Sequence, residues 1–217
     1  MACSLLMFDR DSTYLWMALA LVLTAVMRAN QAFFFWGQFE TVHGFELITV
    51  VLLVPLALGA WTLAWRSWFQ LPGRAWLHGV GLLTFLYAGA EFLERSWFYG
   101  VFPHAVNAAA HSLITGVRLI FVILMALIVY GGTRRQGREV WYALPALLLI
   151  SIGQFARELS ALGIPGIWFP FGTGVSLTQF AYAAFDFAFF CLLLHRLQQF
   201  ARRSRQPRFG AASCTES

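Results

Sequence analysis

Long apolar runs separated by short polar segments dominate the sequence. A bilayer core about 30 Å thick needs roughly 20 apolar residues of helix, because backbone N–H and C=O groups in lipid must be satisfied within the segment. Six stretches meet this requirement, over residues 13–34, 45–65, 75–93, 105–130, 140–156 and 171–197. The pattern predicts an all-α, polytopic membrane bundle of about six transmembrane helices over 13–197, after a cytoplasmic N-terminus (1–12) and before a basic cytoplasmic tail (198–217).

Composition agrees with a membrane protein. The chain is 59% hydrophobic and only 12% charged, whereas soluble domains carry roughly a quarter charged residues. Nine Trp, 22 Phe and six Tyr fit the enrichment of aromatic side chains at bilayer interfaces. Cys3, Cys191 and Cys214 do not form a disulfide framework by their spacing. The acidic start MACSLLMFDRDS favours a retained first helix over a cleaved signal peptide.

Basic residues follow every second predicted helix. They are Arg66 and Arg74 after the second, Arg134, Arg135 and Arg138 after the fourth, and Arg196, Arg202, Arg203, Arg205 and Arg208 after the sixth. Because Arg-rich loops stay in the cytoplasm, both ends are predicted to be cytoplasmic, in a plasma or bacterial inner membrane. The same arginines account for the net charge of +5 without nucleic acid. The tail either prolongs the sixth helix or rests on anionic headgroups.

Two predicted helices carry polar stripes at helical spacing. On the fourth helix the stripe is His104, Asn107, His111, Thr115 and Arg118; on the sixth it is Thr173, Ser176, Gln179, Tyr182 and Asp186. Both stripes start at the outer end and stop near the middle of the membrane, so these faces avoid lipid.

Arg118 and Asp186 lie at matched depth, each about 14 residues and therefore about 21 Å from the outer end of its helix. A single charge there costs roughly 2.5–3.5 kcal/mol on insertion scales, so the two should face inward and pair. The pair is interpreted either as a contact to a ligand or as a clamp between two helices.

The remaining polar residues favour the outer half as well, including Arg28 on the first helix and Glu91 on the third. The inner halves of the last three helices are almost wholly apolar. We therefore expect an outward-facing polar pocket, closed below by apolar side chains and lined by Arg118, Asp186, His111, Glu91, Gln179, Tyr182 and Arg28. A channel or carrier needs polar lining on both sides, so a pocket with one mouth favours a receptor or an enzyme.

Candidate chemistry in this pocket is limited. Glu91, Glu94, His104 and His111 supply metal-ligand atoms, but the two histidines are seven residues and about 10.5 Å apart along the axis, and no H-E-x-x-H motif is present. Histidines do not pair at one depth for haem, and no serine lies in a G-x-S-x-G frame. The prediction is no metal, no cofactor and no assigned catalytic residue.

The segments FFFWGQFETV, VPLALGAWTLAWRSWFQLPG and FPFGTGVSLTQFAYAAFDFAFF resemble the multi-pass membrane region of bacterial SpoIIE-type protein serine phosphatases. In such proteins the membrane region is the input half, and a cytoplasmic metal-dependent phosphatase domain follows. Only nine residues follow Arg208 here, without the acidic motifs of that domain. The resemblance therefore implies a sensor region and no phosphatase activity in this chain.

The leading hypothesis is a non-enzymatic sensory or ligand-binding membrane module, with membrane lipids, a small molecule from the outer side and a cytoplasmic effector as its partners. One alternative is an intramembrane enzyme that uses Glu91, Glu94 or His111 on a lipid-like substrate. Another is a structural subunit whose polar stripes only join helices.

Overall fold

The protein is all-α and carries several helices that can cross a membrane. The computed structural model describes residues 12–37, 41–95, 103–136, 138–164, 167–168 and 175–205. Within these residues, the strands β1 (Ile167–Trp168) and β2 (Val175–Ser176) pair antiparallel, and the regular structure around them is helical. Five described segments are long and apolar enough to span a bilayer: Thr13–Gly37, Val42–Trp68, Ala75–Arg95, His104–Arg135 and Leu177–Gln198. The chain is therefore a multi-pass membrane protein.

The fifth predicted span, residues 140–156, is shorter than expected. Helix α7 (Arg138–Gln154) has an apolar part over Trp141–Gln154, about 21 Å at 1.5 Å per residue and so less than the hydrocarbon core. A turn at Phe155 and the short helix α8 (Ala156–Ala161) follow. Five spans are supported by length and composition in the described residues, in place of the six expected.

The last helix begins later than its apolar run predicts. Residues 171–174, where the prediction starts it, lie outside the described residues, and Val175 and Ser176 belong to β2. Helix α9 covers Leu177–Arg205. It continues beyond residue 197, so the first basic residues of the predicted tail are helical.

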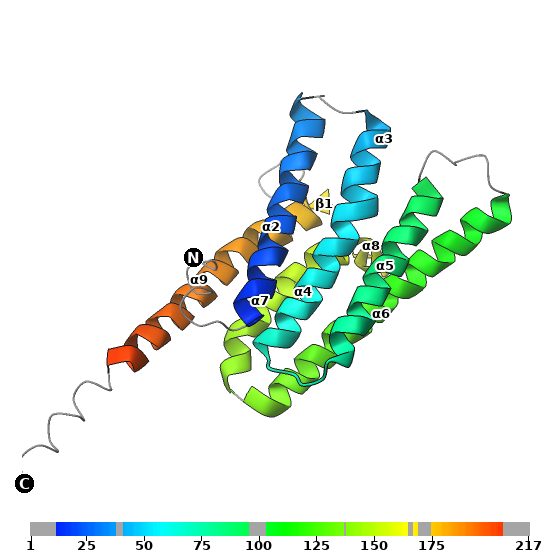
Figure 1. The fold of residues 1–217 in the computed structure, drawn as a ribbon. Coiled ribbons are helices and arrows are strands. Elements are labelled where there is room, and N and C mark those ends of the chain that lie inside the picture. The colour runs from blue at the N-terminus through cyan, green and yellow to red at the C-terminus, as the bar shows by residue number, and fades with distance from the viewer. Residues whose placement is uncertain are drawn as a thin grey trace, which may run out of the picture. The chain divides into compact units, whose positions relative to one another are not determined.

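The chain divides into two compact units, Met1–Gly137 and Arg138–Ser217, which we call unit 1 and unit 2. Unit 1 contains α2 (Ser12–Ala32), α4 (Val54–Trp68), α5 (Ala75–Arg95) and α6 (His104–Gln136). Helix α4 contacts α2, α5 and α6 (Figure 1). Its central place explains why most of its side chains are buried.

Aromatic residues fill the core around α4. Trp61, Trp65 and Phe69 are four residues apart and stack in sequence at centroid distances of 6.1 and 6.2 Å. The indole Nε1 of Trp61 donates a hydrogen bond to the Thr24 hydroxyl of α2 at 3.0 Å. These tryptophans join helices, unlike the interfacial role expected for aromatic residues in a membrane protein.

Before α4 the helix has π geometry. Segment η1 (Phe33–Gly37) ends the first span, and α3 (Val42–Phe45) and η2 (Glu46–Leu53) begin the second. The Val54 N–H donates to the Thr49 carbonyl, five residues back. Pro55, at the start of α4, has no N–H to continue the α-helical pattern in that turn. Such π segments are common at functional sites, and η2 carries Glu46.

The turn between α4 and α5 packs against the end of α6. Gln70 and Gly73 have positive φ angles of 52° and 112°, which help to reverse the chain over the six residues between α4 and α5. A Cβ on Gly132 would lie 2.9 Å from the Phe69 ring, and one on Gly131 would lie 2.9 Å from Leu71. Glycine at both positions therefore permits this close approach.

Unit 2 is built on the contact between α7 and α9. Helix α7 buries Leu147 and Ile150, and α9 buries Phe185 and Phe189. The two phenylalanine rings stack at 5.3 Å. Spacings of three and four residues place these side chains on one face of each helix.

Candidate functional site

Polar side chains of unit 1 gather where η2, α5 and α6 meet. We call this group the charged cluster; it comprises Glu46, Tyr87, Glu91, Glu94, Arg95, His111 and Arg118. Tyr87, Glu91 and Arg95 are four residues apart and therefore share one face of α5. Glu94 also belongs to α5, whereas Glu46 comes from η2 and His111 and Arg118 come from α6. The site therefore depends on the packing of three elements.

Arg95 links two carboxylates of the cluster. Its Nε donates to Glu91 Oε2 at 3.1 Å, and its Nη1 donates to Glu46 Oε1 at 3.4 Å. Glu91 is only 3% exposed, and a carboxylate removed from water in this way requires a cationic partner. Arg95 therefore satisfies the buried charge of α5 and joins α5 to η2.

His111 of α6 pairs with Glu94 of α5. The His111 Nδ1 lies 2.9 Å from Glu94 Oε1, and the histidine side chain is about half exposed. Glu94 is three residues from Glu91 and adds its negative charge to the surroundings of that buried carboxylate. The pair is consequently the accessible edge of the charged cluster.

Arg118 is the innermost cation of the cluster. It is 8% exposed and donates from Nη1 to the Tyr87 hydroxyl oxygen at 2.7 Å. Its guanidinium carbon also lies 5.8 Å from the centroid of the Tyr87 ring, within the range of a cation–π contact. Arg118 also acts electrostatically on Glu91, so one tyrosine and one carboxylate offset the buried charge.

The cluster descends about two helical turns into the membrane-spanning part of unit 1. Arg95 and Tyr87 are eight residues apart on α5, and His111 and Arg118 are seven apart on α6, which correspond to about 12 and 10 Å along the axes. Three carboxyl groups accompany two guanidiniums in the cluster, and His111 is its most exposed member. The site therefore meets its surroundings through His111.

Two acceptor atoms near His111 are unsatisfied. Glu94 Oε2 and Asn107 Oδ1 are buried and accept no hydrogen bond from any residue that the structure describes. Asn107 lies one helical turn from His111 on α6. A buried acceptor without a donor costs about 1–3 kcal/mol. The site is therefore suited to a ligand that donates hydrogen bonds.

Three predicted site residues, Glu91, His111 and Arg118, come together in this cluster. Arg28 lies on α2, where it donates to the Gln31 side chain of its own helix at 2.8 Å. Gln179, Tyr182 and Asp186 lie on α9 in unit 2, with Gln179 and Asp186 on the exposed part of its surface. The pairing of Asp186 with Arg118, and a pocket lined by all seven residues, stay predictions.

Tyr182 has a clear packing role within unit 2. A Cβ on Gly153 of α7 would lie 2.9 Å from the ring of Tyr182, so the glycine lets α9 approach α7.

We expect Gly153→Val to destabilise the protein by about 1–3 kcal/mol, because the ring and the helix must move apart. The midpoint of unfolding in SDS would measure this effect. Gly81→Val on α5, where a Cβ meets no atom within 4 Å, is the matched control. Equal midpoints for both variants would contradict the packing role.

Sequence reasoning missed Arg95 and Glu46 as site residues. Arg95 follows Glu91 by four residues, and an i, i+4 pair of opposite charge is a detectable signal. Glu46 stands alone before an apolar run, so its proximity to Arg95 depends on how the helices pack. Only the structure reveals that contact.

The described residues show two further features that bear on the expected pocket. No group of three or more His, Cys, Asp or Glu side chains among them is arranged to hold a metal ion. One pocket lies between α5 and α6 and is lined by apolar residues near the start of α5. It lies beside the first half of α5, and its last lining residue on that helix, Leu83, precedes Tyr87 of the charged cluster by one helical turn.

Comparisons of the chain with models of known protein families, with curated proteins and with solved structures found no match. The geometry of the chain alone therefore carries the functional proposal.

Proposed function

We propose that this chain is a membrane-embedded sensory or ligand-binding module whose input site is the charged cluster. The observation that carries the proposal is the accessible His111–Glu94 pair beside two buried acceptors to which no described residue donates. A group that only joins helices has no use for unsatisfied acceptors, because each one opposes folding. A small polar ligand with N–H or O–H donors would satisfy them.

The coupling of ligand to signal follows from the contacts of the cluster. A donor bound at Glu94 Oε2 would share that carboxylate with His111, which contacts Oε1, and would change the field at Glu91, three residues away. Glu91 is in turn joined to η2 through Arg95 and influenced by Arg118 of α6. A change at the exposed edge would thus alter the packing of α5 with both neighbours.

The orientation proposed for this module has both ends in the cytoplasm and the charged cluster in the outer half of the membrane. The arginines at residues 66, 74, 134 and 135 support it, because they lie at the opposite ends of the unit 1 helices. The ligand would then enter from outside, and the basic end of α9 would meet a cytoplasmic effector. The resemblance to the membrane regions of SpoIIE-type phosphatases suits such an input role.

The test is native mass spectrometry of the detergent-purified protein. We expect the wild type to retain a small molecule that is not a phospholipid. Glu94→Ala should lose at least nine-tenths of the bound molecule, which corresponds to about a tenfold loss of affinity. Ser112→Ala is the matched control, because that hydroxyl is exposed and donates to the Ala108 carbonyl of its own helix. Equal occupancy in Glu94→Ala and wild type would refute the proposal.

A second candidate, an intramembrane enzyme acting on a lipid-like substrate, is favoured by the His111–Glu94 distance of 2.9 Å. A carboxylate that orients a histidine is a common general acid–base arrangement. Hydrolysis of a lipid ester by the wild type, abolished in His111→Ala, would favour this function over ligand sensing.

A further inference from the structure

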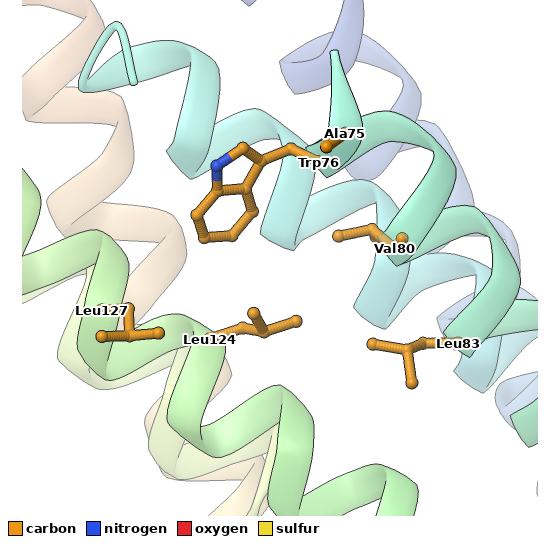
Figure 2. Close-up of a pocket in the computed structure, with 7 residues that line it drawn as sticks. Ala75, Trp76, Val80, Leu83, Leu124 and Leu127 are labelled. Carbon is orange, nitrogen blue, oxygen red and sulfur yellow. The ribbon is translucent and has the colours of Figure 1, made fainter. Parts of the chain in front are cut away.

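A pocket of about 260 Å³ lies between the first half of α5 and the second half of α6 in unit 1. Its lining comprises Ala75, Trp76, Gly79, Val80, Leu83, Leu124 and Leu127. Figure 2 shows the Trp76 indole and the Val80 and Leu83 side chains of α5 facing Leu124 and Leu127 of α6. The lining side chains are aliphatic apart from one tryptophan, so the pocket suits an apolar occupant.

The pocket has the length of a segment of hydrocarbon chain. It extends from Ala75 to Leu83, eight residues along α5, which correspond to about 12 Å. Both helices are membrane-spanning candidates, so the pocket opens where acyl chains are the surrounding solvent. A Cβ on Gly79 would meet no atom within 4 Å. The glycine therefore leaves room for an occupant instead of admitting a neighbouring helix.

Arginines surround the end of unit 1 at which the pocket begins. Arg74 directly precedes Ala75, and Arg134 lies seven residues beyond Leu127 on α6, with its guanidinium carbon 4.6 Å from the centroid of the Tyr130 ring. Arg66 donates from Nη2 to the Gly73 carbonyl at 3.0 Å. Its Nε is buried and donates to no residue that the structure describes. Arg74 and Arg134 are exposed, so their guanidiniums are accessible to an anion.

The carboxylates in the described part of unit 1 lie away from the end at which the pocket begins. Its described carboxylates, Glu46, Glu91 and Glu94, belong to the charged cluster. Arg74 and Glu91 are 17 residues apart, about 25 Å along α5. The arginines at the pocket end consequently lack nearby carboxylates from the described part of unit 1 and attract an external anion.

From this combination we propose that the pocket binds one acyl chain of an anionic phospholipid, with the phosphate held by Arg66, Arg74 and Arg134. The apolar lining accounts for the chain, and the arginines account for the headgroup. Basic sites between transmembrane helices have this chemistry. A second copy of the protein would fill the pocket with side chains and would leave the arginines facing another basic surface.

Two glycines of α5 allow a matched test. Gly79 lines the pocket and Gly81 does not, and neither has an atom within 4 Å of a built Cβ. Leucine at either position also improves helix propensity. We expect Gly79→Leu to fill the pocket and Gly81→Leu to leave it open, with both proteins folded as judged by thermal unfolding.

The readout is native mass spectrometry after exchange into mixed vesicles of phosphatidylglycerol and phosphatidylcholine. We expect the wild type and Gly81→Leu to retain phosphatidylglycerol preferentially, and Gly79→Leu to lose most of it. Arg74→Gln should reduce the preference about fivefold, the effect of one basic residue near a charged lipid. Phosphatidylglycerol with brominated acyl chains should also quench the fluorescence of Trp76. That contribution is the difference in tryptophan fluorescence between the wild type and Trp76→Phe.

Three results would overturn the proposal. Equal retention of the two lipids would exclude recognition of the headgroup. Equal retention of phosphatidylglycerol in Gly79→Leu and Gly81→Leu would place the lipid elsewhere. A dimer that Gly79→Leu converts to a monomer, without a change in bound lipid, would assign the pocket to a second copy of the chain.

Discussion

Gly59→Leu is expected to destabilise the protein by about 3 kcal/mol or more. A Cβ at this position of α4 would collide with the hydroxyl oxygen of Thr84 on α5 and lie 3.4 Å from its Cβ. Gly59 sits in the most buried helix of unit 1, which contacts α2, α5 and α6. A leucine side chain would have to displace Thr84, and inserted volume in a packed core costs about 1–3 kcal/mol or more.

The midpoint of SDS-induced unfolding in mixed micelles would measure this loss. Gly89→Leu is the matched control, because a Cβ at Gly89 of α5 meets no atom within 4 Å. A gentler pair isolates the collision itself. Gly59→Ala should destabilise although alanine favours helices by about 1 kcal/mol, and adding Thr84→Ala should recover most of the loss. If Gly59→Leu unfolds at the wild-type midpoint, α4 and α5 are not in contact at this point.

The sequence predicts the helices of unit 1 well because a single physical requirement controls them. Backbone groups in lipid must be satisfied locally, so an uncharged run of about 20 residues becomes a helix. Periodicity also places His111 and Arg118 seven residues apart on α6, and Glu91 and Glu94 three residues apart on α5. These features depend only on positions along one helix.

The short strand, the π-helical segment and the contacts within the charged cluster could not be predicted from apolar periodicity. Val175 and Ser176 follow Gly172, Thr173 and Gly174, and periodicity alone does not separate so short a strand from the first turn of a helix. The π geometry of η2 depends on Pro55, which the sequence only identifies as a break. The partners within the charged cluster depend on helix packing, as the Arg95–Glu46 contact between residues 49 positions apart illustrates.

Arg118→Ala is the second change expected to have a large effect, about 2–3 kcal/mol of destabilisation. Hydrogen bonds between transmembrane helices average only about 0.6 kcal/mol, so loss of the Tyr87 contact alone would have a small effect. A lone Arg at mid-membrane costs roughly 2.5–3.5 kcal/mol on insertion scales. When α5 and α6 assemble, Tyr87 and Glu91 surround the Arg118 guanidinium and offset the cost of placing it in the membrane. Arg118 therefore favours assembly of the two helices, and alanine at this position does not.

Unfolding in SDS would again measure the change, with Thr115→Ala as the control, because that exposed hydroxyl donates to the His111 carbonyl of its own helix. Combining Arg118→Ala with Tyr87→Phe gives the coupling within unit 1. Combining it with Asp186→Ala tests the predicted ion pair, for which we expect a coupling of at least about 1 kcal/mol.

The same variants separate the sensory function from a structural one. If Arg118→Met with Asp186→Leu retains both stability and the bound small molecule, the two charges serve neither packing nor binding, and the proposed relay through Arg118 is wrong. If stability is retained and the molecule is lost, the charges contribute to the site, since a well-packed apolar pair can replace a buried ion pair without loss of stability. A ligand-binding module predicts this second result, whereas a structural subunit has no bound molecule to lose.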